Sequence, residues 1–277
     1  MTIAVSAATG QLGTLVLAAL KARGATPVAL ARTPSKVTGY EARAFDYTAP
    51  DAAALAGVEV LVLISSNDFN DRAGQHAKAI AAAKAAGVGR IVYTSILKGE
   101  ASPMVMLASD HVATEAALKA SGVAYTILRN GWYTENLTGN LGAALEHGAL
   151  IGAAGEGRYA AAPRADFAEA AAVVALEAGH EGQVYELAGD TAFTMAELAA
   201  EVAKQSGKPV AYVNMTQADY AKALEGFGLP AAFAATLAEC DAVTGTAGAL
   251  YDEGHRLSRL IGRPTTPMAE TVRAALA

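Results

Sequence analysis

Residues Ile3–Gly13 read "IAVSAATGQLG", and this stretch decides the fold. It has the pattern of a buried strand, then a glycine-containing turn, then the start of a helix. In turns of this kind one glycine allows a tight bend, a second lets the backbone approach a pyrophosphate, and a third lets the helix pack closely on the strand. Gly10 and Gly13 occupy the second and third positions, whereas Ala7 stands at the first.

The alanine leaves two interpretations of the turn open. A methyl group costs little if Ala7 has a negative φ, and about 1 kcal/mol or more if the turn needs a positive φ. In either case the helix that begins near Gly10 directs free N–H groups toward a phosphate. The alternative is a glycine turn retained only for packing. The turn residues that we expect to bind a dinucleotide are Ala8, Thr9, Gly10, Gln11, Leu12 and Gly13.

Short apolar runs alternate with helical stretches through the first half of the chain. The predicted strands are 3–7, 27–31, 41–45, 58–64, 90–95 and 124–129. The predicted helices are 11–23, 51–56, 72–86 and 109–121. This alternation is typical of a doubly wound parallel sheet in an α/β protein. The strand at 58–64 is apolar on both faces, as expected where helices cover both sides.

The rhythm changes after Arg129. We predict helices at 165–178 and 194–206, strands at 184–188 and 209–213, and two or three further helices up to the C-terminus. The sequence therefore predicts a Rossmann-type core at 1–130 and a smaller mixed α/β region at 131–277. Because no Pro- or Ser-rich linker separates them, the second part is expected to be partly interleaved with the core.

Composition excludes several classes of protein. A net charge of −6 disfavours broad nucleic-acid binding, which depends on clustered Lys and Arg. No apolar run approaches the roughly 20 residues that span a bilayer, and no export signal precedes the first strand. Cys240 is the single cysteine, so we expect a small buried thiol in a reduced, cytoplasmic protein. We expect no partner among nucleic acids or membranes, and no metal site.

The residues after the second strand indicate which cofactor is preferred. An Asp or Glu normally binds the NAD ribose there, but this segment reads "ALARTPSK", and no acid precedes Glu41. Arg32 and Lys36 could instead hold a 2′-phosphate through charge-assisted hydrogen bonds. The alternative is a pair of solvated surface residues. We therefore predict NADPH as the cofactor.

Polar residues also follow the third and fourth strands. Asp46 is placed to accept a hydrogen bond from an adenine amino group, with Tyr47 beside it, although a turn cap would explain Asp46 equally well. Ser65, Ser66 and Asn67 end the fourth strand, where parallel strands face the ligand crevice. We expect all five to line the cofactor.

A Tyr and a Lys four residues apart, the usual catalytic pair of short-chain dehydrogenases, are missing. None of the ten tyrosines has a lysine four residues later. The corresponding helix instead carries His111 and Glu115, either a histidine with its orienting carboxylate or an ordinary surface pair. Hydride transfer to a quinone or to a cationic dye-like carbon fits, because such acceptors need no strong proton donor.

Several stretches together resemble the NmrA-like, atypical branch of the short-chain dehydrogenases, near the bacterial NADPH:quinone oxidoreductases and triphenylmethane reductase. They include "ATGQLG", "ARTPSK", "HVATE", "YTILRNGWYTEN", "EHGALIGAAGEG" and "GHEGQVYELAGD". The resemblance covers nearly the whole chain. It implies NADPH bound along residues 8–13 and by Arg32, and a quinone in the cleft between the two parts.

The resemblance also implies roles for the loop after the sixth strand. Asn130 is expected at the cofactor, and Trp132, Tyr133 and Asn136 at the substrate, with interface packing as the alternative for Trp132. The catalytic group is not assigned, and His111 and Tyr133 are the candidates.

Three functions remain in competition. The first is an NADPH:quinone oxidoreductase that works without flavin. The others are a non-catalytic NADP(H)-binding redox sensor of the NmrA type, and a reductase of another planar aromatic or dye-like acceptor. A homodimer is an option that the sequence leaves open.

Overall fold

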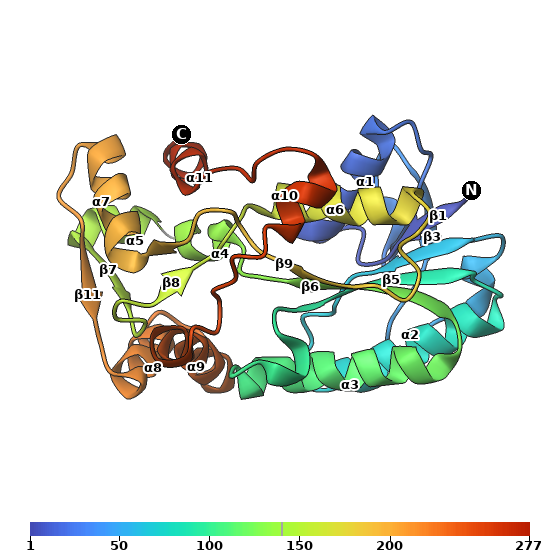
Figure 1. The fold of residues 1–277 in the computed structure, drawn as a ribbon. Helices are drawn as coiled ribbons and strands as arrows, with labels where there is room; N and C mark the ends of the chain where they lie inside the picture. Colours follow the sequence, from blue (N-terminus) through green and yellow to red (C-terminus); the bar gives the residue numbers. More distant parts are fainter. Residues whose placement is uncertain (140) are drawn as a thin grey trace.

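A parallel sheet of seven strands forms the frame of the protein (Figure 1). The computed structural model describes residues 1–139 and 141–277. The strands are β1 (Ile3–Val5), β2 (Val28–Ala31), β3 (Glu41–Ala44), β4 (Val60–Leu63), β5 (Arg90–Ile96), β6 (Ala124–Asn130) and β9 (Val184–Leu187). They lie in the order β3-β2-β1-β4-β5-β6-β9, and every pair is parallel. The first six follow the Rossmann order, so the predicted fold class is confirmed.

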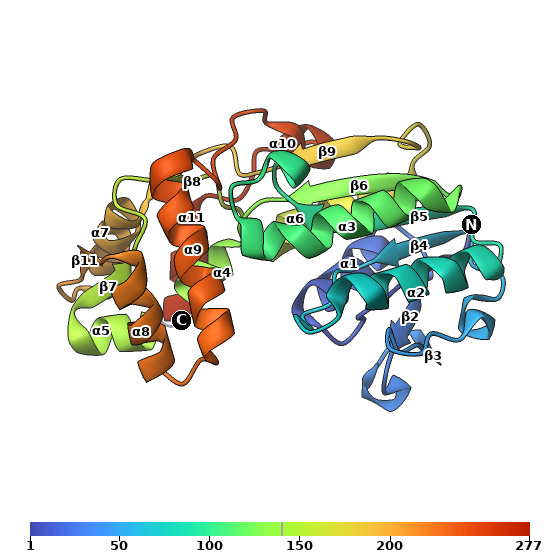
Figure 2. The same cartoon turned by 90° about the horizontal axis from the view of Figure 1, so that it is seen from below.

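Helices cover both faces of this sheet. They are α1 (Gln11–Ala22), α2 (Arg72–Ala85), α3 (Val105–Ser121), α6 (Arg164–Leu176) and α10 (Arg256–Ile261). Figures 1 and 2 show α1, α6 and α10 on one face and α2 with α3 on the other. In β4 alternate residues enter different cores: Val60 and Val62 pack toward α1 and α6, whereas Leu61 and Leu63 pack on the side of α2. This explains why the strand is apolar throughout.

A smaller part built from the second half of the chain extends beyond the sheet (Figure 2). Its elements are α4 (Thr134–Thr138), α5 (Leu141–His147), β7 (Ala149–Gly152), β8 (Arg158–Tyr159), β10 (Phe193–Thr194), α7 (Met195–Ser206), β11 (Ala211–Asn214), α8 (Gln217–Gly226), α9 (Ala231–Ala247) and α11 (Met268–Leu276). Strands β7 and β11 pair in parallel, and β8 pairs with β10 antiparallel. A core of its own fills this part and includes Cys240, which is buried as predicted.

Besides shifts of one or a few residues at several element ends, three differences from prediction stand out. Helix α3 begins at Val105 rather than at residue 109, and the helix predicted at 51–56 is a short 3-10 helix, Ala52–Leu55. Four helices, not two or three, follow β11 within residues 215–277, all of which the structure describes. Thr194 caps α7: its hydroxyl accepts from the Glu197 amide, and the Glu197 carboxylate accepts from the Thr194 amide. Among the described helices, none is long and apolar enough to cross a membrane.

Candidate functional site

The glycine turn after β1 is strained at its first position. Ala7 has a φ of 48°, in the left-handed region that favours glycine. The interpretation in which Ala7 keeps a negative φ is therefore wrong, and the substitution costs of order 1 kcal/mol or more. Two main-chain hydrogen bonds hold the turn in this shape. The Gly10 amide donates to the Ala7 carbonyl at 2.9 Å, and the Ala8 amide donates to the Leu30 carbonyl at 3.1 Å.

The other two glycines of the turn are retained where space requires them. A Cβ on Gly13 would lie 2.3 Å from the Ala7 carbonyl oxygen, and one on Gly10 would lie 3.2 Å from the same atom. Gly13 therefore lets α1 pack against the turn. No side chain caps α1, whose N-cap is Gly10, and its first turn carries no acidic residue. The start of this 12-residue helix is thus suited to an anionic group.

Two basic residues follow β2, where the sequence predicts the 2′-phosphate site. Both Arg32 and Lys36 are exposed, and neither takes part in an ion pair among the described residues. The structure also brings two carboxylates within electrostatic reach of Arg32. Hydrogen bonds within their own turns lower the pKa of Asp46 and of Asp68, and the charge of Arg32 lowers both further. Asp68 had no sequence signal, because it lies on a different loop.

Asp46 and Tyr47 both have partners within the protein. One carboxylate oxygen of Asp46 accepts from the amide and from the hydroxyl of Thr48, each at 2.9 Å, so Asp46 does cap a turn. The Tyr47 hydroxyl lies 2.6 Å from the carbonyl oxygen of Ile64 and 2.5 Å from Oγ of Ser6. It therefore ties the loop after β3 to the ends of β1 and β4. The contacts of both residues with adenine stay predictions.

The polar residues after β4 hold the start of α2 in place. The Ser66 amide donates to Nε2 of His76 at 2.9 Å, and the Ser66 hydroxyl donates to Gln75 at 3.1 Å. The Ser65 hydroxyl makes a long contact of 3.5 Å with the Ser66 carbonyl, and it lies close enough to the Tyr93 hydroxyl to lower the pKa of Tyr93. Asn67 is exposed. The loop is thus fixed to α2 through Ser66, while Ser65 and Asn67 keep side-chain atoms for other partners.

A hydrogen-bonded network is buried between the sheet and helices α2 and α3. Because a main-chain amide donates to Nε2 of His76, the proton of this ring is on Nδ1, 2.9 Å from Oγ1 of Thr114. The Tyr93 hydroxyl lies 2.9 Å from Nδ1 of His111. Burial, followed by the charge of Arg72, lowers the pKa of His76 to about 4 and that of His111 to about 3. Both imidazoles are therefore neutral near pH 7.

His111 and Glu115 do not form either of the arrangements expected from their spacing. Both are buried, and no hydrogen bond or ion pair joins them in the described part of the chain. Glu115 instead accepts two hydrogen bonds from Arg129, at 2.9 and 2.7 Å, and one from Ser95 at 2.7 Å. Arg129 also donates to Glu186 at 2.9 Å. Both interpretations were wrong, because the inner face of α3 directs the two side chains to different partners.

Polar atoms without partners gather at the end of β6. Within residues 1–139 and 141–277, no hydrogen bond is made by Oδ1 of Asn130, by Nε1 of Trp132 or by Oγ1 of Thr134, although all three atoms are buried. Buried polar groups normally have a partner, because leaving one unpaired costs about 1–3 kcal/mol. Trp132 itself packs in the core of the smaller part. Buried polar atoms without partners of this kind are suited to contacts with a ligand.

Tyr133 is the N-cap of α4, Asn136 lies within this helix, and both contact Arg164. The Tyr133 hydroxyl accepts from Nδ2 of Asn130 at 3.2 Å, and its ring packs edge-on against Phe167. The guanidinium of Arg164 lies 4.8 Å from the Tyr133 ring centroid and donates to Oδ1 of Asn136 at 2.5 Å. Burial raises the pKa of Tyr133. Tyr133 is therefore a neutral hydroxyl near pH 7.

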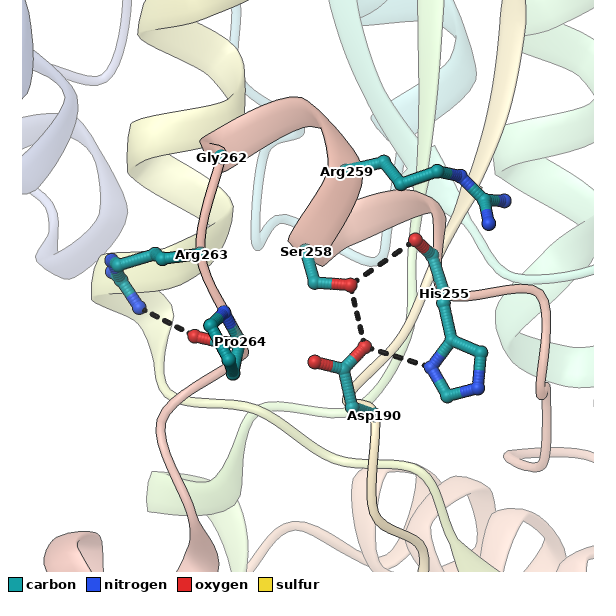
Figure 3. A pocket seen from close by; sticks show the side chains of 7 residues that line it. All are labelled: Asp190, His255, Ser258, Arg259, Gly262, Arg263 and Pro264. Atoms are coloured by element: carbon teal, nitrogen blue, oxygen red, sulfur yellow. Dashed lines mark hydrogen bonds and ion pairs between the residues drawn. The ribbon is translucent and has the colours of Figure 1, made fainter.

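An open hollow of about 510 Å³ lies elsewhere, beside α10 (Figure 3). Asp190 forms its base and binds the Ser258 hydroxyl at 2.7 Å, Nδ1 of His255 at 2.9 Å and the Thr265 amide at 2.8 Å. The proton of Ser258 is directed to the carboxylate and not to the imidazole, so the group is no Ser-His-Asp nucleophile. The hydrogen bonds of Asp190 hold residues 255–265 against the segment that follows β9. None of its lining residues belongs to the glycine turn.

The glycine turn, the uncapped α1 and the orphaned atoms after β6 all lie toward the carboxyl ends of the strands, where open parallel sheets of this kind bind dinucleotides. A family model described as NAD(P)H-binding matches residues 7–178, more than half of the chain. The chain belongs to this NAD(P)H-binding family. The match begins within the glycine turn and ends just past α6. It confirms the family to which the sequence motifs pointed.

The similarity to known proteins extends over nearly the whole chain. Quinone oxidoreductase 2 of Escherichia coli is 51% identical over 279 residues, 98% of this chain and 97% of the relative. A solved E. coli NADPH-dependent quinone oxidoreductase in complex with NADPH is 50% identical, with a TM-score of 0.93, and covers 99% of this chain and 100% of its own. Citrobacter triphenylmethane reductase, solved with NADP(H), is 35% identical, with a TM-score of 0.90 and the same coverage.

The sequence patterns did not indicate three further residues, which lie at the loop after β4, at the start of α2 and on α9: Phe69, Arg72 and Phe233. Arg72 is the first residue of α2 and is buried. Phe69 and Phe233 come from the loop before α2 and from α9, and their ring centroids are 5.3 Å apart. A charged residue at a helix start resembles a surface residue in sequence, so nothing in the pattern announced its burial.

Proposed function

We infer that this protein is an NADPH-dependent quinone oxidoreductase. The observation that carries this conclusion is 51% identity to a quinone oxidoreductase over 98% of the chain. The solved relative with bound NADPH has the same fold over 99% of the chain. Residues of the site fit the same cofactor, which agrees with the preference for NADPH inferred from the sequence.

NADPH would be held by three groups of residues. The uncapped first turn of α1 and the glycine turn suit the pyrophosphate, and Arg32 suits the 2′-phosphate, because no acid competes on its own loop. Oδ1 of Asn130 is a buried acceptor without a partner, which suits an amide donor of the cofactor. These roles, with those of Lys36, Asp46, Tyr47, Ser65, Ser66 and Asn67, are proposals.

The acceptor would bind beside the loop after β6. Trp132, Tyr133 and Asn136 are the residues proposed to contact it, with the orphaned Nε1 of Trp132 as a donor to one of its oxygens. When bound, NADPH supplies a hydride, so no flavin is required. Near pH 7 the neutral His111 has no imidazolium proton to donate, and the raised pKa of Tyr133 makes its hydroxyl a weak acid, so the proton that completes the reduction would come from water.

The remaining expectations stay proposals. The boundary near residue 130 is one of them, since α6, β9 and α10 from the second part pack on the sheet of the first. A cytoplasmic location and a homodimer are the others.

Oxidation of NADPH mixed with a panel of small quinones tests the function. We expect turnover with quinones in the absence of added flavin, and one NADPH consumed per quinone reduced. Tight binding of NADPH without turnover of any quinone or dye would overturn the proposal and favour a sensor.

A further inference from the structure

Arg72 is a buried cation without a partner. Its side chain begins α2 and the residue is only 4% exposed. Within the described residues, Nε and Nη1 make no hydrogen bond, although both atoms are buried. Asp68 and Asp110 are close enough to act on its pKa, which burial lowers, but neither forms an ion pair with it. A buried guanidinium without hydrogen-bond partners lowers the stability of the folded protein. Natural proteins tolerate unsatisfied groups of this kind mainly at functional sites.

The groups around Arg72 do not neutralise its charge. His76 and His111 are neutral near pH 7, and Tyr93 keeps its proton because burial raises its pKa. The ring of Phe69 covers the guanidinium, with its centroid 4.2 Å from Cζ. Arg72 is therefore a desolvated positive charge whose aromatic and imidazole neighbours are neutral, and among the described residues it forms no ion pair with the nearby Asp68 or Asp110. An oxygen that gains negative charge beside it would be strongly stabilised.

Arg72 also lies where the two parts of the protein meet. It follows the loop after β4, the strand next to β1 and its glycine turn. Phe69 on that loop touches Phe233 on α9, and the two rings are tilted by 46°. The N-terminal end of α3 meets α9 nearby, where the Met106 amide donates to Glu239 at 3.0 Å (Figures 1 and 2). Both Phe rings are partly exposed, so they form a cover rather than a core.

We propose that Arg72 binds an oxygen of the acceptor and holds the negative charge which that oxygen gains on reduction, while Phe69 and Phe233 pack against the acceptor ring. This inference rests on the proposed function, because it takes a quinone as the acceptor. It assigns to Arg72 the stabilisation of negative charge, which a cation provides more strongly than the neutral His111 or Tyr133.

The reaction balances with this assignment. A quinone that accepts a hydride gains two electrons and one proton, and the cofactor is oxidised to NADP⁺. The product of that step is a hydroquinone monoanion, whose phenolate oxygen pairs with the guanidinium. A proton from water then gives the neutral hydroquinone, which no longer needs the cation and leaves.

Three measurements on Arg72→Met test the proposal, with Arg90→Met as the matched control. Arg90 is also a buried arginine, but it lies at the amino end of β5 and donates to the carbonyls of Ala175 and Glu177. Cofactor-free Arg72→Met is expected to melt at or above the wild-type temperature, and Arg90→Met below it. With benzoquinone, kcat of Arg72→Met should fall about 100-fold while the Kd of NADPH is unchanged.

The third measurement does not depend on turnover. 4-Nitrophenolate, an anionic stand-in for the hydroquinone monoanion, is titrated into the NADP⁺-loaded protein by calorimetry. Its affinity should fall about tenfold or more in Arg72→Met and less in Arg72→Lys. Phe69→Leu and Phe233→Leu should each raise KM for benzoquinone about two- to tenfold with kcat little changed.

The outcomes separate this inference from the proposed function. A lower melting temperature for Arg72→Met with unchanged kcat would make Arg72 structural, and a weaker Kd for NADPH would assign it to the cofactor. Either result overturns the inference. If the wild type reduces no quinone, the proposed function fails, whereas unaltered binding of nitrophenolate to Arg72→Met defeats the role of Arg72.

Discussion

Arg129 and Arg72 both lie near the carboxyl ends of the strands, and they differ in how their charge is balanced. Arg129 has two carboxylate partners, Glu115 and Glu186, and the buried Glu115 also accepts from Ser95. Arg72 is more deeply buried and has none in the described part of the chain. A buried arginine whose hydrogen bonds are all made to carboxylates is typical of a structural contact. A buried arginine without such partners is typical of a site that receives a ligand.

The same contrast separates two regions. The Arg129 network joins β5, α3, β6 and β9 with all its oxygens bonded. The segments that follow β1, β4 and β6 have instead a strained Ala7, an Arg72 without a partner among the described residues, and orphaned atoms on Asn130 and Trp132. The segments after β1, β4 and β6 therefore lower the stability of the folded protein, whereas the Arg129 network raises it.

The largest expected effect is that of Arg129→Met. It leaves Glu115 buried without its cation, so the free energy of unfolding should fall by about 3–5 kcal/mol. Urea denaturation measures the free energy of unfolding, and Arg72→Met is the control, in which this free energy should not decrease. Equal losses in the two variants would remove the distinction between the two arginines.

Arg32→Ala should affect binding and leave stability unchanged. Arg32 is exposed and makes no ion pair among the described residues, so unfolding should not change. The Kd of NADPH should rise about 10- to 100-fold, because charge-assisted hydrogen bonds to the 2′-phosphate are lost. Fluorescence titration with NADPH and NADH checks this. An equal loss for both cofactors would make Arg32 structural.

As the pH falls, the free energy of unfolding should first decrease through His76, which lies near Arg72, and only at lower pH through Glu115, the partner of Arg129. His76 titrates at 6.5 in the unfolded chain and at about 4 in the folded protein. Below pH 6.5 only the unfolded chain takes up that proton, so stability falls as the pH drops from 6.5 toward 4. The folded pKa of Glu115 lies below 4.5, because the Arg129 and Ser95 hydrogen bonds outweigh its burial, so its contribution is lost only at lower pH.

His76→Gln tests this order of titration. The slope of unfolding free energy against pH should decrease by up to about 1.4 kcal/mol per pH unit between these limits. Urea titrations across the range measure it. A slope that stays at the wild-type value would show that His76 is not held neutral.

The smallest effect is that of Ala7→Gly. Glycine adopts the positive φ of this position without strain, so the unfolding free energy should rise by about 1 kcal/mol and NADPH should bind somewhat more tightly. Ala8→Gly is the control, since Ala8 has no positive φ and should gain nothing. A loss of stability in Ala7→Gly would contradict the assigned strain.

The sequence predicts the parallel sheet well, because the central strands β1, β2 and β4 are apolar on both faces and glycines follow α2 and α3. The start of α3 was missed because Val105 and Met106 are apolar yet exposed, so they do not follow the helical pattern. The turn residues were identified, but the sign of φ at Ala7 depends on the surrounding loops and could not be read from residue type.

The side-chain partners were the least predictable part of the site. His111 and Glu115 are four residues apart, but their partners Tyr93 and Arg129 lie on two strands distant in sequence. The burial of Arg72 has the same origin. It depends on Phe69 and on helices α2 and α3, which only the assembled fold brings together.

Hydrogen–deuterium exchange of the protein with and without NADPH tests the central claim most directly. If the glycine turn, the loop after β4 and the residues after β6 form the ligand site, NADPH should protect the amides of residues 8–13, of the loop after β4 and of residues 130–134. The Arg129 network and the hollow beside α10 should exchange as before. Protection centred on residues 255–265 and absent from the glycine turn would contradict the account.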